Sequence, residues 1–263
     1  MTADAAAAPA LSAADVSVRL TGALIVDGAT LELRAGELTA LVGPNGAGKT
    51  TLMRALAGLL PAQGRIALNG RTLAALSAGE RARAIAYLPQ GNVFHWPMSV
   101  AAVVALGRHP HADAFSPLTD ADRAAVGRAL AATAVEPWAA RAVTTLSGGE
   151  RARVALARAL ATQAPILLAD EPTMSLDPRH QLVVMDLLAR AAHDGGAVLA
   201  IVHDLALAAR FADRVVMMER GRLVADGAPR EVLTPEQIAT VFGVDAVITD
   251  SAVGPIPVLR RPL

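Results

Sequence analysis

Short apolar runs alternate along the chain with longer segments whose apolar positions recur at helical spacing. The runs at 38–42, 166–169, 197–202 and 214–218 are almost uninterrupted, which is typical of strands buried on both faces. The spacing of leucine, valine and alanine predicts a helix over 179–192. Strands that alternate with helices predict an α/β fold with a mainly parallel sheet and helices on both of its faces.

The chain before residue 90 is more polar and predicts shorter strands joined by turns. Weak alternation predicts an antiparallel pair at 16–20 and 29–33. A hairpin over 64–73 is expected to turn at Asn69-Gly70, because both residue types tolerate the positive φ of a tight turn. A short strand at 85–88 ends at a proline. Together these segments predict an N-terminal antiparallel β part.

A third pattern, rich in alanine, leucine and arginine, covers about 98–160 and is interrupted by prolines and glycines. We expect a helical lobe at about 91–160, inserted between two halves of the sheet. The chain has no internal repeat or long linker, so a single domain over 15–256 is the economical interpretation. Residues 1–14 lack a basic residue followed by an apolar core, which predicts a disordered tail and not a signal peptide.

Composition narrows the classes of function. Lysine plus arginine and aspartate plus glutamate each number 24 among 263 residues, so the net charge is zero and gives no support to nucleic-acid binding through a basic surface. The absence of cysteine excludes disulfides, thiolate metal sites and a cysteine nucleophile. The mean hydropathy is positive, but the longest stretch without formal charge, 84–107, contains prolines and polar residues unsuited to crossing a bilayer.

A glycine-rich loop lies between the predicted strand at 38–42 and a predicted helix at 50–60, which is the context in which such loops bind phosphate. Its glycines let backbone amides approach a phosphate chain, and the helix N-terminus adds donors and a positive dipole end. Lys49 is expected to bridge the β- and γ-phosphates, and the Thr50 hydroxyl to bind Mg²⁺. The residues expected to bind nucleotide are Gly43, Pro44, Asn45, Gly46, Ala47, Gly48, Lys49, Thr50 and Thr51.

Acidic and imidazole side chains follow two other predicted strands. Asp170 and Glu171 end the run at 166–169; Asp170 is expected to orient Mg²⁺, and Glu171 to polarise the attacking water as general base. His203 follows the strand at 197–202, which we expect to lie beside the strand that carries Asp170. These groups would then meet at the carboxyl edge of the sheet, where ligands bind in open α/β folds. The alternatives are a solvated acidic pair and a structural histidine.

The segment Leu146-Ser147-Gly148-Gly149-Glu150 precedes an amphipathic helix. Its backbone amides and hydroxyl would suit an anion at a helix N-terminus. The alternative is an ordinary capping box, in which Ser147 and Glu150 satisfy each other's backbone amides. A chain with one phosphate-binding loop has little need of a second for the same nucleotide, which leaves the purpose of an additional anion site open.

In this order, the glycine loop, the 146–150 segment and the acidic strand end resemble the ATP-binding cassette of ABC transporters, and nearly the whole chain fits that pattern. The resemblance implies a P-loop NTPase core that binds ATP and Mg²⁺ and hydrolyses ATP. It also implies that His203 contacts the γ-phosphate and that Gln90 senses Mg²⁺ and γ-phosphate. The implied catalytic residues are Glu171, His203 and Gln90, and the implied Mg²⁺ ligands are Thr50, Gln90 and Asp170.

The resemblance further implies a homodimer. In this family the 146–150 segment contacts ATP held by the glycine loop of a second subunit, so Ser147, Gly148 and Gly149 are assigned to nucleotide binding across the dimer. The segment Ser175-Leu176-Asp177 matches the loop that communicates between the two subunits.

Two further stretches are similar to those of bacterial importers for iron–siderophore complexes, haem and cobalamin. They are 100–111, which ends Gly107-Arg108-His109-Pro110-His111, and 221–227 with 231–234. The resemblance implies a transport ATPase at the cytoplasmic face of the inner membrane, peripheral to it. Its implied partners are a dimeric transmembrane permease and, indirectly, a periplasmic substrate-binding protein, with no nucleic acid.

Two alternatives within the family remain open. One is the ATPase of an exporter, although exporters are often fused to their membrane helices. The other is a non-transport ATPase that acts on DNA or ribosomes. Relatives that act on DNA carry a long coiled coil between the glycine loop and the 146–150 segment, and relatives that act on ribosomes usually have two cassettes in one chain. Here that interval holds a compact helical insert, and the chain has one cassette.

One position departs from the family pattern, and one histidine pair raises the question of a metal site. The family places an aromatic residue about thirty positions before the lysine to stack on adenine, and here that position is Leu20, so we expect modest discrimination between ATP and GTP. His109 and His111 lack a carboxylate at ligand spacing and are expected to be solvated instead of binding metal.

An apolar cluster follows Gln90. It is interpreted either as core packing of the helical lobe or, as we favour, as a groove for a short helix of a membrane partner. Its members are Val93, Phe94, Trp96, Pro97 and Met98.

Overall fold

A central mixed sheet forms the framework of the molecule, whose computed structural model describes residues 9–91, 94–112, 117–251 and 254–263. Its strands are β3 (Glu37–Val42), β6 (Ile85–Leu88), β7 (Ile166–Ala169), β8 (Ala197–Ile201), β9 (Arg214–Glu219) and β10 (Arg222–Gly227). They are ordered β10-β9-β3-β8-β7-β6, and all neighbours are parallel except β10, which is antiparallel to β9. The expected α/β fold with a mainly parallel sheet is confirmed.

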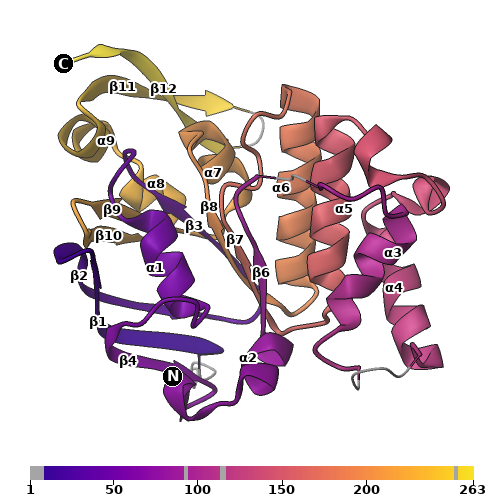
Figure 1. Ribbon diagram of the computed structural model, residues 1–263. Helices are drawn as coiled ribbons and strands as arrows, with labels where there is room; N and C mark the ends of the chain where they lie inside the picture. The colour runs from indigo at the N-terminus through magenta and orange to yellow at the C-terminus, as the bar shows by residue number, and fades with distance from the viewer. Residues whose placement is uncertain (1–8, 92–93, 113–116, 252–253) are drawn as a thin grey trace, which may run out of the picture.

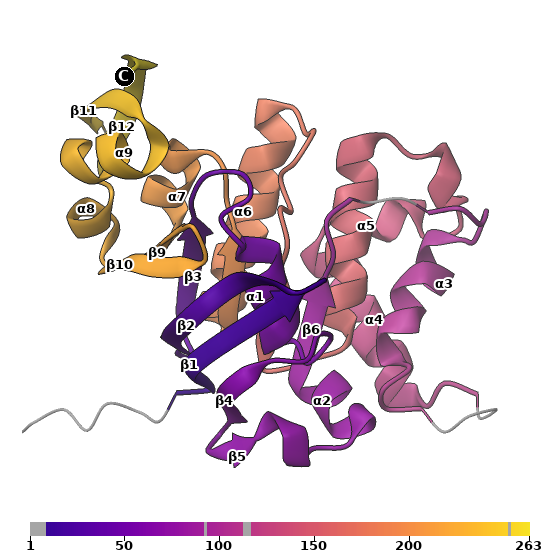
Figure 2. The ribbon, with the colours of Figure 1, turned by 60° about the vertical axis from the view of Figure 1, so that its left-hand side comes forward.

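A second, antiparallel sheet forms the N-terminal part. Its strands are β1 (Leu11–Leu20), β2 (Ala23–Leu33), β4 (Gln63–Leu68) and β5 (Arg71–Thr72), in the order β2-β1-β4-β5. The turn between β4 and β5 has φ values of 45° at Asn69 and 79° at Gly70, as the Asn-Gly pair predicts. Helix α1 (Lys49–Leu56) packs its apolar side chains into the core shared by the two sheets. Figure 2 shows the position of this helix beside the strands.

The helical lobe lies between β6 and β7 in sequence and at one side of the molecule (Figure 1). It contains α3 (Val100–Ala105), η2 (Leu106–Arg108), α4 (Asp120–Ala132), η3 (Glu136–Trp138), η4 (Val143–Thr145) and α5 (Gly148–Ala161); η1 (Leu73–Ala75) and α2 (Ala78–Ala84) precede β6. Helix α5 joins the lobe to the sheet, because Val154 packs in the core of the lobe and Leu156 packs in the core of the sheet.

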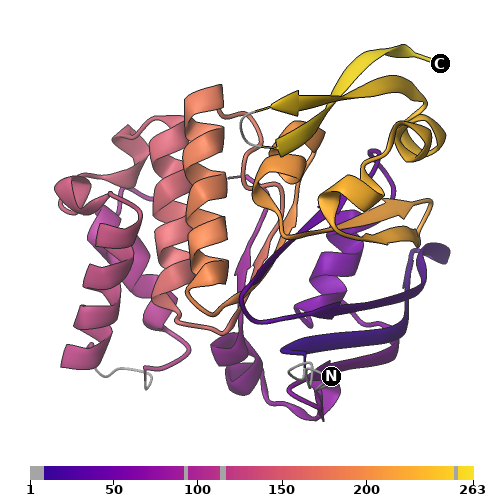
Figure 3. The ribbon, with the colours of Figure 1, turned by 180° about the vertical axis from the view of Figure 1, so that it is seen from behind.

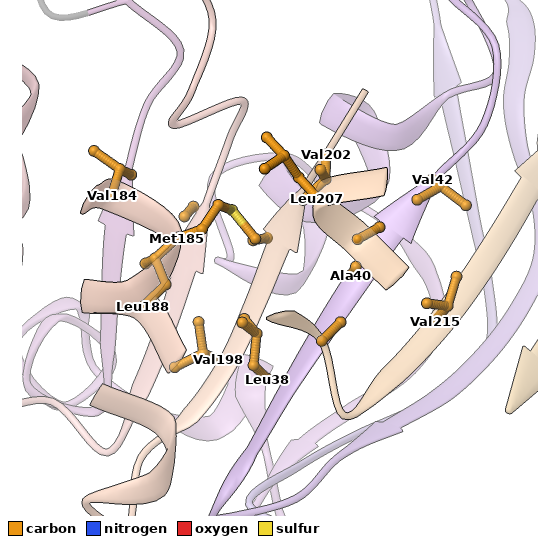
Figure 4. Close-up of a cluster of buried hydrophobic side chains, with 14 of the residues drawn as sticks. Leu38, Ala40, Val42, Val184, Met185, Leu188, Val198, Val202, Leu207 and Val215 are labelled. Carbon is orange, nitrogen blue, oxygen red and sulfur yellow. The ribbon is translucent and has the colours of Figure 1, made fainter. Parts of the chain in front are cut away.

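Helices α6 (Pro178–His193) and α7 (Leu205–Phe211) cover one face of the sheet, and α5 and α6 run side by side in the view from behind (Figure 3). Figure 4 shows how Met185 and Leu188 of α6 approach Leu38 of β3 and Val198 of β8. The sheet residues alternate between this core and the core on the opposite face. Strands buried on both faces therefore account for their nearly uninterrupted apolar sequence.

The sequence patterns predicted no helix or strand in the C-terminal part. It consists of α8 (Pro229–Val232), α9 (Pro235–Phe242) and a hairpin of β11 (Val244–Ser251) and β12 (Gly254–Pro262). None of the helices in the described residues has the length and hydropathy of a bilayer-spanning segment.

The bounds of three elements differ from those expected. Strand β1 begins at Leu11, inside the tail expected over 1–14, because Leu11 and Ala13 alternate into the core and pair with β2 and β4; residues 1–8 lie outside the described residues. Strand β12 continues to Pro262, past the domain end expected at 256, since it pairs along the length of β11. The helix expected over 50–60 ends at Leu56, because Gly58 adopts a φ of 70°.

Candidate functional site

The candidate site lies where the carboxyl ends of adjacent parallel strands meet. Strand β8 lies between β3 and β7, and β6 pairs with β7. The glycine loop follows β3, Gln90 follows β6, Asp170 and Glu171 follow β7, and His203 follows β8. The expected neighbourhood of the His203 and Asp170 strands is confirmed, and it brings the predicted polar groups to one edge of the sheet.

The glycine loop is packed closely against its surroundings. Gly43 has a φ of 151°, and a Cβ atom there would lie 2.1 Å from the Met218 carbonyl oxygen. Gly48, the N-cap of α1, has a φ of 102°, and a Cβ atom there would lie 2.7 Å from the Ile25 carbonyl oxygen. Only glycine fits both positions without moving backbone. The loop conformation is therefore fixed by the fold itself.

Lys49 lies inside this loop. Its ammonium donates hydrogen bonds to the carbonyl oxygens of Gly43 at 2.7 Å and Pro44 at 2.8 Å. Burial lowers the pKa of Lys49 below its ordinary value, and the nearby Glu171 and Asp170 carboxylates oppose that shift. The buried ammonium places a cation against the loop, where it is suited to bind a phosphate chain, and the two carboxylates favour its protonated form.

Asp170 is fully buried and both of its oxygens accept hydrogen bonds. The Thr50 hydroxyl donates to Oδ1 at 2.9 Å, and the Tyr87 hydroxyl donates to Oδ2 at 2.9 Å. Burial raises the pKa of Tyr87, so the phenol remains protonated and able to donate at neutral pH. A hydrogen bond with Tyr87 in turn raises the pKa of Arg54. These four residues form one connected network around Asp170.

Glu171 is held from two sides. Gln90 donates from Nε2 to Oε2 at 2.8 Å, and His203 Nε2 lies 2.7 Å from Oε1. His203 Nε2 must carry the hydrogen, because a carboxylate offers only acceptors. Glu171 also has a φ of 51°, which costs a residue other than glycine about 1–2 kcal/mol. Backbone in this region is typical of functional sites.

A cavity of about 350 Å³ opens beside the glycine loop. It is lined by Leu20, Ile25, Asn45, Gly46, Ala47, Gly48, Lys49, Thr50, Thr51 and Glu171. Leu20, the position at which an adenine-stacking residue was expected, is thus one of the residues that line this cavity. The group of residues fits a nucleoside triphosphate with Mg²⁺: the loop supplies backbone amides and a buried ammonium, while Thr50 and Asp170 supply the oxygen ligands that this cation prefers.

The 146–150 segment is separate from this cavity, since none of its residues is among those that line it. The Ser147 hydroxyl accepts from the Glu150 amide, and the Glu150 carboxylate accepts from the Ser147 amide, so the capping box is formed. Ser147 and Gly148 are exposed, whereas Gly149 is buried against His180. Of the other predicted site residues, 45–51 and Glu171 line the cavity. The rest contact residues that line it: Gly43 and Pro44 accept from Lys49, Asp170 accepts from Thr50, and Gln90 and His203 contact Glu171. Ser147, Gly148 and Gly149 are not brought to the cavity.

The apolar cluster after Gln90 is divided between core and surface. Phe94 and Met98 pack against the core of the helical lobe, as the core-packing alternative predicted. The Trp96 residue is 74% exposed, and Pro97 is also exposed. Val93 lies outside the described residues.

The 107–111 stretch ties the helices of the lobe together. Arg108 is buried; it donates to Asp122 and to the Ala161 carbonyl, each at 2.8 Å. His109 and His111 are both exposed, as expected, and His111 Nε2 also lies 2.8 Å from the Thr162 carbonyl oxygen. Among the described residues no cluster of histidine and acidic side chains is suited to a metal ion. This stretch has a structural explanation.

Sequence reasoning missed Tyr87, Arg54 and His180. Tyr87 is the only tyrosine in the chain and is the third residue of the short strand β6, three residues before Gln90, a position that could have suggested a polar partner near the sheet edge. Arg54 and His180 lie on helices whose packing no local pattern specifies, so nothing in the sequence indicated them.

A glycine loop between a parallel strand and a helix, with an acidic pair at a neighbouring strand end, defines a P-loop nucleotide-binding protein. A family profile described as ABC transporter matches residues 26–174. The hemin import ATP-binding protein HmuV of Streptomyces coelicolor is 48% identical over 232 residues, which cover 88% of this chain and 82% of that protein. The chain belongs to the ABC transporter family.

Two further similarities agree with this assignment. The cobalamin import ATP-binding protein BtuD of Halobacterium salinarum is 46% identical over 255 residues, covering 96% of this chain; the chain spans 64% of the length of that protein. A solved structure described as an inward-facing conformation of a metal-chelate type ABC transporter matches with a TM-score of 0.83 at 25% identity, covering 97% of both chains.

Proposed function

We propose that this chain is the ATP-hydrolysing subunit of an importer that takes up a metal chelate through a separate membrane permease. The cargo class is an iron–siderophore complex, haem or cobalamin. The proposal is supported by the family, by the names of relatives assigned to hemin and cobalamin import, and by the likeness to a metal-chelate type transporter. Such a subunit would lie at the cytoplasmic face of the inner membrane, bound to the permease and indirectly to a periplasmic binding protein.

In this proposal the cavity beside the glycine loop holds ATP. The loop amides and the Lys49 ammonium bind the β- and γ-phosphates, and the adenine rests on Leu20. Thr50, Asp170 and Gln90 would hold Mg²⁺, which neutralises charge that develops on the phosphate oxygens. Asp170 is suited to this because Tyr87 fixes the orientation of its carboxylate through Oδ2.

Glu171 is the proposed general base. The observation that carries this assignment is its place at the cavity wall, with one oxygen held by Gln90 and the other by His203. Each carboxylate oxygen keeps a further lone pair, so Glu171 can accept a proton from water while Gln90 and His203 hold it. Gln90 and His203 would thus orient the base, and His203 would also be able to donate to the γ-phosphate if it turned from Glu171.

The proposed active unit is a homodimer. Ser147 and Gly148 are exposed, lie outside the cavity of their own subunit, and present the N-terminus of a helix, which favours anions. These features fit the contact expected with ATP bound to the loop of a second subunit. Ser175, which has a φ of 59°, lies in the loop expected to cross the same interface.

Substitution of Glu171 by glutamine tests the enzymatic part of the proposal. The variant keeps the size of the side chain but replaces one acceptor oxygen with an amide donor and loses the basicity, so it should bind MgATP, hydrolyse it slower by about 10²–10⁴-fold, and accumulate as a dimer. Normal turnover would remove Glu171 from the role of base. The import part is tested by co-expression with the permease and by uptake of haem, cobalamin and ferric siderophore; uptake of none of them would contradict it.

A further inference from the structure

The two glycines of the 147–149 segment are in different environments. Gly148 is exposed, and a Cβ atom built there would meet nothing within 4 Å. Gly149 is buried, and a Cβ atom built there would lie 2.2 Å from Cδ2 and 2.3 Å from Cγ of His180. Gly148 therefore faces outward and Gly149 faces the first turn of α6. A side chain at 149 could fit only if the imidazole moved.

The imidazole is held in place. Asp177 caps α6, accepting the His180 amide at Oδ1 at 3.0 Å and lying 2.8 Å from His180 Nδ1 through Oδ2. The His180 side chain is 19% exposed. Turning the ring away from Gly149 would break the Asp177 contact and expose a ring that is now packed. The clash at 149 is consequently not relieved by a free rotation.

His180 thereby connects two segments that are distant in sequence. On one side lies the start of α5, with exposed Ser147 and Gly148; on the other lies Asp177, the last residue of the loop expected to cross the dimer interface. We propose that His180 is a positioning residue that sets the start of α5 against the 175–177 loop, so that both are presented to the partner subunit in a fixed arrangement. This inference rests on the proposed dimeric function.

A different explanation of Gly149 is that a side chain there would obstruct the nucleotide of the partner subunit. The two explanations differ in one consequence. If Gly149 is required because His180 occupies the space, then removal of the imidazole must make alanine tolerable at 149. If Gly149 is required by the partner, then alanine at 149 is harmful whether or not His180 is present.

The experiment measures MgATP-induced association of the Glu171→Gln protein by analytical ultracentrifugation. We expect Gly149→Ala to weaken association by about tenfold or more, in keeping with the usual cost of overpacking. His180→Ala should weaken it by about threefold or more, as coupled residues do. The double variant should return to within about threefold of His180→Ala alone. Gly148→Ala is the matched control. A Cβ atom at 148 meets nothing within 4 Å in its own subunit, so any loss of association in this variant would come from the partner. His180→Ala should therefore not restore association to Gly148→Ala.

Binding of a fluorescent ATP analogue to each monomer serves as the second readout. It should not change, because the cavity lies elsewhere, whereas general misfolding would lower it. If Gly149→Ala lowers the thermal unfolding midpoint, the double variant should recover it. A double variant that associates no better than Gly149→Ala, or a His180→Ala protein that associates normally, overturns the inference. Failure of the Glu171→Gln protein itself to associate would instead overturn the proposed dimer.

Discussion

Replacement of Tyr87 by phenylalanine probes the network that positions the proposed Mg²⁺ ligand Asp170. The change deletes one hydroxyl that donates to Asp170 Oδ2 at 2.9 Å, while Thr50 keeps its bond to Oδ1 at 2.9 Å. Asp170 is fully buried, so water has little access to replace the lost donor. The carboxylate would be freer to rotate, and its fit to Mg²⁺ would be poorer.

Two estimates of the loss in Mg²⁺ affinity caused by Tyr87→Phe agree. A hydrogen bond to a charged group contributes about 1.5–3 kcal/mol, and loss of a residue that orients a metal ligand typically weakens metal affinity about 10–100-fold. At 1.4 kcal/mol per tenfold these ranges overlap. Because the Thr50 contact to Asp170 remains, we expect the lower end: about a tenfold rise in the Mg²⁺ concentration at half-maximal ATPase rate.

The assay is ATPase rate against Mg²⁺ at saturating ATP, supported by Mn²⁺ binding followed by electron paramagnetic resonance. Thr133→Val is the matched control, since it deletes another buried hydroxyl, bonded to the Ala129 carbonyl in the helical lobe, and should leave the Mg²⁺ dependence unchanged. If Tyr87→Phe has the same Mg²⁺ dependence and Mn²⁺ affinity as the unmodified protein, the reasoning about this network is refuted.

Three other variants have defined outcomes. Leu20→Tyr should tighten ATP binding by about 1–3 kcal/mol through stacking, measured by calorimetry; an unchanged Kd would mean that adenine does not lie at Leu20. Trp96→Ala should abolish uptake but preserve nucleotide binding, and normal uptake would exclude Trp96 as a permease contact. Hydrogen bonds from Thr119 and Arg108 lower the pKa of Asp122 from 3.8 to about 2, so its stabilising effect is complete above about pH 4 and is lost towards pH 2. Asp122→Asn should therefore lower the thermal unfolding midpoint at pH 7. The difference in midpoint between the variant and the unmodified protein should disappear as the pH falls from about 4 to about 2. A difference that does not depend on pH would contradict this.

Much of the framework follows from local patterns. The strands at 38–42, 166–169 and 197–202 are almost entirely apolar because both faces are covered, and the polar groups after them meet because parallel neighbours end at one edge. The order of elements therefore predicted that Asp170, Glu171 and His203 converge.

What the sequence did not predict depends on contacts between distant segments. The bond from Tyr87 to Asp170 requires the β6–β7 pairing, and the packing of His180 on Gly149 requires α5 and α6 to lie side by side. The strand starting at Leu11 was missed because its alternation is hidden in an alanine-rich stretch. Such features arise from tertiary packing, which periodicity along one chain does not encode.

The central claim is that the exposed Ser147 of one subunit faces the glycine loop of the other when ATP is bound. The chain has no cysteine, so pairs of introduced cysteines report only on that contact. Asn45 lies in the loop and is exposed, as is Ser147. The Glu171→Gln protein with Asn45→Cys and Ser147→Cys should form a covalent dimer on mild oxidation with MgATP, because a disulfide requires Cα atoms within about 7 Å. A band for the monomer alone, in the presence of bound MgATP, would contradict the account.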